Sequence, residues 1–179
     1  WYIFAMNRSR KNKTKPNASQ SIPERVVRDM HAAVALHQAG NLKQAKSSYR
    51  KILARVPALT DARHYLALAL HQSGDNEGAL PYIHRAAREQ PDNPAVHSNM
   101  GLVLQGLGRL PEARMRFERA LELAPDFLDA RCNLGNVLGE LGEPARAAEC
   151  YQEVLEVSPD DAQVLDNFGC SAKRSWARR

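Results

Sequence analysis

Three histidines have the widest range of possible chemistry in this chain, and their spacing limits what they can do. His37 and His71 lie 34 positions apart, and His64 precedes His71 by seven. Imidazole can bind a metal or exchange a proton near neutral pH. If residues 60–72 form one helix, however, His64 and His71 lie about 10 Å apart along its axis, which is too far for two ligands of one ion. We therefore expect polar histidines and no metal or other cofactor.

The cysteines and acidic residues give no pattern that indicates an enzyme. Cys132, Cys150 and Cys170 are odd in number, whereas the disulfide framework of a short secreted chain usually has an even count. Glutamates such as Glu118 and Glu122 alternate with arginines at helical spacing, as solvated helix faces do. The sequence therefore predicts reduced thiols, a cytoplasmic location, no catalysis and no small-molecule substrate.

Asparagines offer a different chemistry, which is recognition of a peptide backbone. Asn99, Asn133 and Asn167 recur every 34 residues, each followed by an apolar residue and a glycine. A carboxamide both donates and accepts hydrogen bonds, so a row of them can satisfy the N–H and C=O groups of an extended peptide. The alternative is that these amides tie neighbouring helices together. The row is incomplete, because His31 and Tyr65 hold the corresponding earlier positions.

The elements that must position these residues are four copies of a 34-residue unit. The units run 26–59, 60–93, 94–127 and 128–161 without an insertion, and residues 162–174 begin a fifth. Among the repeating columns are glycines (Gly40, Gly74, Gly108, Gly142), alanines (Ala45, Ala79, Ala113, Ala147) and prolines (Pro57, Pro91, Pro125, Pro159).

Each unit is predicted to be a hairpin of two helices. Apolar residues recur three and four apart on both sides of the glycine column, where a glycine with positive φ can end the first helix. Pro111 and Pro144 fit the first turn of a second helix, whereas Pro81 predicts a late start or an irregular first turn. Each hairpin buries its apolar face only against a neighbour, so we expect an all-α solenoid over residues 23–174.

The net positive charge is concentrated at the two ends. The chain has 25 basic and 20 acidic residues, and residues 1–22 carry five basic residues and no acid. We expect a disordered basic arm over 1–22 and a basic tail over 175–179, and therefore no basic folded face for nucleic acid. No apolar run approaches the length of about 20 residues that a membrane-spanning helix needs. The interrupted fifth unit could also mediate self-association.

These columns resemble the tetratricopeptide repeat family, in segments such as Asn133-Leu134-Gly135 and the run from Gly108 to Ala113. The resemblance covers residues 26–174 and implies a right-handed superhelix whose concave groove binds extended peptides or partner proteins. The asparagine steps are similar to the ladder in the repeat arm of O-linked N-acetylglucosamine transferase and related bacterial proteins. Chaperone-binding relatives use basic clamps, but the expected groove carries Asp61, Asp129, Glu140 and Asp166 and no lysine, so C-terminal carboxylates are not the expected ligand.

Two hypotheses follow. The first is a protein-interaction scaffold that binds a peptide or partner protein along the groove. Its expected binding residues are Asn99, Asn133, Asn136, Asn167, Gln105, Tyr65, His64 and His71. The second is that the chain is the substrate-recruiting arm of a larger glycosyltransferase or sulfotransferase, which the asparagine row and the interrupted fifth unit suggest.

Overall fold

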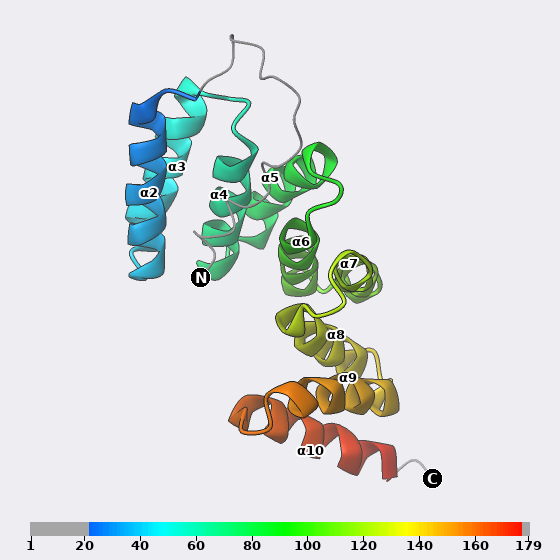
Figure 1. Ribbon diagram of the computed structural model, residues 1–179. Coiled ribbons are helices and arrows are strands. Elements are labelled where there is room, and N and C mark those ends of the chain that lie inside the picture. The colour runs from blue at the N-terminus through cyan, green and yellow to red at the C-terminus, as the bar shows by residue number, and fades with distance from the viewer. Residues whose placement is uncertain (1–21, 177–179) are drawn as a thin grey trace, which may run out of the picture.

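The computed structural model describes residues 22–176, with side chains described as far as Gly169. This part of the chain contains nine helices and no strand (Figure 1). The prediction of an all-α array of helical hairpins is confirmed. Almost all of the predicted basic arm and tail lies outside the described residues.

Four hairpins follow one another, and a single helix continues the series. The hairpins are α2 (Glu24–Gln38) with α3 (Leu42–Arg55), α4 (Thr60–Gln72) with α5 (Asn76–Glu89), α6 (Pro94–Gly106) with α7 (Leu110–Leu123), and α8 (Leu128–Glu140) with α9 (Pro144–Val157). The last helix is α10 (Ala162–Trp176). The second helices begin at intervals of 34 residues, as the sequence period requires.

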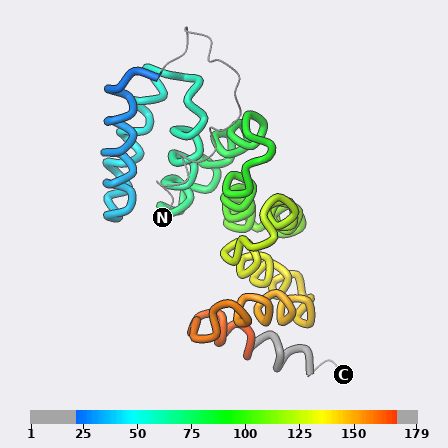
Figure 2. Tube along the Cα trace, in the orientation of Figure 1, coloured from blue at the N-terminus to red at the C-terminus, as the bar shows by residue number. Residues whose placement is uncertain are grey.

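Contacts between hairpins explain why the array is curved (Figures 1 and 2). Each helix contacts its neighbours in sequence, and the first helices also contact one another in the series α2, α4, α6, α8 and α10. Between residues 22 and 176, the second helices of adjacent hairpins make no such contact with each other. The first helices are therefore closer together than the second helices, and they form the inner face of the curve.

The glycine column ends each first helix as predicted. Gly40, Gly74, Gly108 and Gly142 have φ between 72° and 82°, and no other described residue has a positive φ. After each glycine the next backbone N–H donates to the carbonyl of the leucine column, for example from Asn41 to Leu36 at 2.9 Å. The glycine itself donates one turn earlier, from Gly40 to His37 at 3.0 Å. This is the double hydrogen bond that closes a helix at a left-handed glycine.

The prediction of a late or irregular start for α5 was wrong. The helix begins at Asn76, in register with the other second helices, because the Asp75 carboxylate accepts a hydrogen bond from Gly78 N at 2.9 Å. Such a cap satisfies a free N–H of the first turn. Pro81 follows in the second turn on the exposed side, where water can bind the carbonyl that lost its partner.

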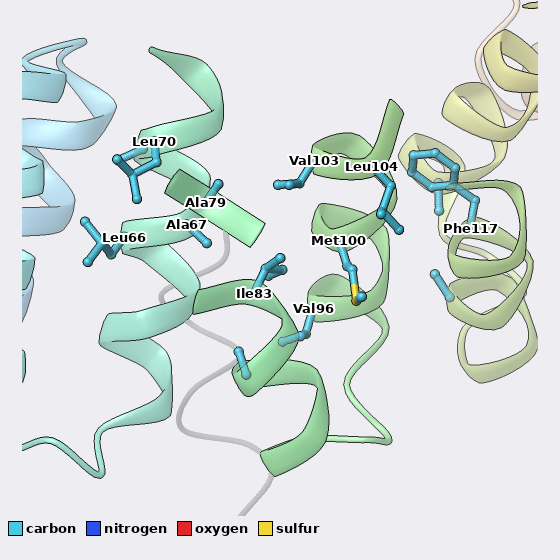
Figure 3. Packing of buried hydrophobic residues seen from close by; sticks show 14 of the residues in the cluster. Leu66, Ala67, Leu70, Ala79, Ile83, Val96, Met100, Val103, Leu104 and Phe117 are labelled. Carbon is cyan, nitrogen blue, oxygen red and sulfur yellow. The ribbon is translucent and has the colours of Figure 1, made fainter. Parts of the chain in front are cut away.

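The core runs through all the hairpins as one continuous cluster, part of which Figure 3 shows between α4 and α7. The alanine column is fully buried, at 0% exposure in every hairpin. A column of large residues packs beside it: Tyr49, Ile83, Phe117 and Tyr151. Small residues thus allow the helices to approach, and large ones fill the space between hairpins.

Glycine is required where two of these rings lie against a first helix. A Cβ atom on Gly135 would stand 2.7 Å from the Tyr151 ring, and the Tyr151 hydroxyl is held by a 2.7 Å hydrogen bond to Asn136 Oδ1. We expect Gly135→Ala to lower the free energy of unfolding by about 2 kcal/mol in urea, because the ring cannot move aside without breaking this bond.

Gly139 in the same helix is the matched control. A Cβ atom there would meet nothing within 4 Å. Gly139→Ala should therefore raise stability by about 0.5 to 1 kcal/mol through helix propensity alone. Equal effects of the two substitutions would show that the approach of the Tyr151 ring does not constrain α8.

A second repeating contact fastens each hairpin to the loop before it. The side chains of Arg63, His97 and Arg131 occupy one column, and each donates a hydrogen bond to the carbonyl of the proline six residues earlier. The His97 bond, from Nε2 to Pro91 O, is 2.8 Å long. These side chains satisfy carbonyl groups that follow the end of a helix and have no helical partner.

Candidate functional site

The inner face of the curve carries a groove of about 880 Å³. It is lined mainly by residues of the first helices, from Val34 in α2 to Val164 in α10. The lining includes apolar side chains such as Leu68, Leu102 and Phe127, and polar ones that are mostly amides and histidines. Its extent across several hairpins suits an extended ligand better than a compact one.

Five of the eight predicted binding residues line this groove: His64, Tyr65, Asn99, Asn133 and Asn136. Asn133 has the greatest capacity for a ligand, because its side chain makes no hydrogen bond with any residue from 22 to 169. It is half-buried on α8, near the middle of the groove. Its carboxamide can both donate to and accept from a peptide bond.

Asn99 lines the groove and also ties two first helices together. Its Nδ2 donates to Nε2 of His64 at 2.6 Å, so that imidazole carries its proton on Nδ1. Burial lowers the pKa of His64 to about 4, although Asp61 acts in the opposite direction. His64 is therefore neutral at physiological pH, and the Oδ1 atom of Asn99 stays available to accept from a ligand.

Asn136 and Asn167 are linked to each other. Asn136 Oδ1 accepts from the Tyr151 hydroxyl at 2.7 Å and from Asn167 Nδ2 at 3.1 Å. Asn167 lies on α10 beside the groove and does not line it. The two readings of the asparagine row therefore apply at different positions, because some amides tie helices together and Asn133 does not.

Aromatic rings pack together in the N-terminal half of the groove. Tyr65 stacks on Tyr49 with ring centroids 6.0 Å apart, and on His64 at 5.5 Å. His37 contacts the Tyr49 hydroxyl at 3.3 Å and Oε1 of Gln72 at 2.8 Å. Burial, reinforced by Tyr65, raises the pKa of Tyr49, so this phenol stays protonated. The cluster gives a rigid wall that can pack against apolar or planar groups.

The remaining two predicted residues do not line the groove. Nδ1 of His71 lies 2.7 Å from Oδ1 of Asn76, at the start of α5. Gln105 donates to the carboxylate of Glu140 in the next hairpin. Both positions face the end of their helix, where the chain turns towards the second helix, and the periodicity alone did not distinguish this side from the groove.

The thiols show no sign of activation. Cys132 lines the groove, and burial together with the charges of Asp161 and Asp129 raises its pKa. Burial also raises the pKa of Cys150, which packs against the core. A thiol with a raised pKa is a poor nucleophile. Across the described residues, no group of three His, Cys, Asp or Glu side chains could hold a metal ion.

Two carboxylates, Asp129 and Asp161, line the C-terminal half of the groove. Asp129 was predicted, whereas Asp161 was missed. Asp161 Oδ1 accepts from Val164 N at 3.1 Å and so caps α10. An aspartate directly before the helical segment at 162 is a cap signal that could have identified it. Asp61 is bonded to Gln90 and Glu140 to Gln105, and neither these two nor Asp166 lines the groove.

The period, the hairpins and the inner groove agree with what two family models recognise. Models described as tetratricopeptide repeat match residues 36–103 and 92–160. The chain belongs to the tetratricopeptide repeat family. Between them the two models span 36–160, and the predicted family is confirmed. The closer likeness to the O-linked N-acetylglucosamine transferase arm stays a prediction.

Solved structures of tetratricopeptide repeat proteins share the fold at low sequence identity. The chain is similar to pilF of Pseudomonas aeruginosa, with a TM-score of 0.76, 25% identity, and coverage of 86% of this chain and 70% of that one. It is also similar to MamA from Desulfovibrio magneticus RS-1, with a TM-score of 0.69, 20% identity and coverage of 76% and 77%. YrrB, described as having an unusual peptide-binding site, gives a TM-score of 0.69, 23% identity and coverage of 79% and 73%.

A comparison with curated protein sequences finds no match. From residue 22 to residue 176, no helix is both long enough and apolar enough to cross a membrane.

Proposed function

We propose that this chain is a non-catalytic scaffold that binds an extended peptide, or an extended segment of a partner protein, along its inner groove. The observation that carries the proposal is Asn133, an asparagine on the groove wall whose carboxamide has no partner among the described side chains. A half-buried carboxamide without a partner is costly unless a ligand or water completes its hydrogen bonds. The membership of the family and the peptide-binding site of YrrB support the same function.

The proposed contacts divide the groove by chemistry. Asn133 and the Oδ1 atom of Asn99 bind the peptide backbone, while Tyr65 and Leu102 provide surfaces for its side chains. Asn136 and Asn167 act by holding the wall in shape, since their amides bond to each other. Backbone recognition at separate positions along the groove favours an extended ligand conformation.

Asn133→Ala should weaken peptide binding without destabilising the fold. The probe is an array of random decapeptides with acetylated N-termini and amidated C-termini, followed by titration of the tightest binder. We expect a five- to tenfold loss of affinity, equivalent to one or two hydrogen bonds of about 0.5 to 1.5 kcal/mol. The melting temperature should stay unchanged, because Asn133 makes no hydrogen bond to a described side chain.

Two further variants test this interpretation. Asn41→Ala removes an exposed asparagine outside the groove and should leave the affinity unchanged. Asn136→Ala removes the partner of the Tyr151 hydroxyl and should lower the melting temperature. Failure of the wild-type chain to bind any decapeptide, or equal affinity of wild type and Asn133→Ala, would contradict peptide binding in the groove.

Two further parts of the proposal concern its setting. Raised thiol pKa values and the free cysteines Cys132 and Cys150 support a reducing, cytoplasmic location. Leu165 is 45% exposed on α10, which supports self-association through the C-terminal helix. That self-association would appear as a dimer in sedimentation, and Leu165→Glu would abolish it.

The alternative, a recruiting arm of a glycosyltransferase or sulfotransferase, uses the same groove for the same kind of ligand. It predicts that the coding sequence continues past Arg179 through further repeats into an α/β domain.

A further inference from the structure

We infer that the groove selects peptides carrying a lysine or arginine side chain, which lies between Asp129 and Asp161 over Cys132. The inference rests on the proposed function, since it names the class of peptide that the groove binds. It starts from the distribution of charge in the lining. Asp129 and Asp161 are the two charged residues there, and the lining contains no lysine or arginine.

Both carboxylates are free to bind a cation. Among the described residues, neither takes part in an ion pair, whereas the arginines of the second helices are largely paired with glutamates. Asp161 uses one oxygen to cap α10, and a carboxylate can accept several further hydrogen bonds. Both charges act on the thiol of Cys132, which places them around one point of the groove wall.

The surroundings fit a basic side chain better than a metal ion. The described residues offer no third metal ligand beside the two aspartates. Apolar lining from Phe127 and Val154 can contact the methylene groups of a lysine or arginine while its charged end reaches the carboxylates. The hydroxyl of Ser158 is a further acceptor in the same part of the lining. Several acceptors around an apolar channel suit an ammonium or guanidinium group, which carries several donors.

The test compares one peptide in two forms. The decapeptide array described above is probed with the wild-type chain, and the tightest binder that contains arginine is resynthesised with citrulline in place of that arginine. Citrulline keeps the shape and removes the charge. Wild type should bind the arginine form about threefold to tenfold more tightly, since each partly exposed ion pair contributes modestly. The preference should decrease between 50 mM and 500 mM NaCl.

The variants assign the preference to the two carboxylates. Asp129→Asn with Asp161→Asn should bind both peptides equally, and asparagine preserves the cap of α10. The control is Asp126→Asn with Asp160→Asn, which removes two exposed charges from the loops before α8 and α10, outside the groove lining. The control should keep the preference for arginine.

The outcomes separate this inference from the proposed function. Peptide binding that depends on Asn133, with no enrichment of lysine or arginine, would overturn the inference and leave the function standing. The same conclusion holds if the Asp129→Asn, Asp161→Asn variant keeps the preference for arginine, or if binding requires a free peptide N-terminus. Absence of any peptide binding would overturn both.

Discussion

Replacing Glu89 with alanine is expected to lower the free energy of unfolding by about 3 kcal/mol in urea at pH 7. Glu89 accepts hydrogen bonds from Arg63, Arg85 and Thr60, and the side chain of Arg63 is only 4% exposed. Without the carboxylate, a buried guanidinium keeps its bond to the Pro57 carbonyl and loses its counter-charge. Removing one partner of a buried ion pair costs several kcal/mol for this reason.

The first hairpin supplies a control in the same two columns. Asp29 and Arg55 occupy the positions of Arg63 and Glu89 with the charges reversed, and their side chains are 39% and 49% exposed. Asp29→Ala should therefore change stability by no more than about 0.5 kcal/mol. If Glu89→Ala costs no more than Asp29→Ala, the Pro57 carbonyl alone satisfies Arg63 and the ion pair does not stabilise the fold.

Acidification from pH 7 to pH 5 should lower the free energy of unfolding by about 2 kcal/mol through His64 alone. Burial lowers the pKa of His64 to about 4 in the folded chain, against 6.5 when it is exposed. The unfolded chain therefore binds a proton here across this window and the folded chain does not. The contribution to stability is complete above pH 6.5 and is lost as the pH falls towards 4.

His64→Gln should remove this part of the pH dependence, because glutamine can still accept from Asn99 Nδ2 and does not titrate. His84→Gln, at an exposed position of α5, controls for the loss of a histidine. Glu89 acts at lower pH. Burial alone would raise its pKa, but hydrogen bonds from Thr60 and Arg85 and the charge of Arg63 hold it below 4.5. A pH profile of His64→Gln parallel to that of wild type would show that His64 accepts a proton in the folded chain.

The sequence predicted the parts of the fold in which one residue type serves one geometry. A positive φ after a helix selects glycine, so Gly40 and its equivalents could be identified from their spacing. Alanines at the close contacts are likewise constant, because any larger side chain would separate the helices. Pro81 misled the analysis, since its effect depends on which side of α5 faces water.

Contacts that cross between columns could not be predicted. Arg63 and His97 both donate to a proline carbonyl, although one is a guanidinium and the other an imidazole. The column therefore shows no single residue type that would reveal the contact. The same applies in the groove, where the sequence places Asn99 and Asn133 in one column. Only the positions of their neighbours show that Asn99 is bonded to His64 and that Asn133 is not.

The central claim, that an extended peptide binds along the inner face, is tested most directly by nuclear magnetic resonance. The ¹⁵N-labelled chain would be titrated with the tightest capped decapeptide from the array. We predict that the largest shifts fall on the side-chain amide of Asn133 and on the groove-facing residues of α4, α6 and α8, with smaller changes in α5, α7 and α9. Shifts confined to the second helices or to the loops between hairpins, with the Asn133 amide unmoved, would contradict the claim.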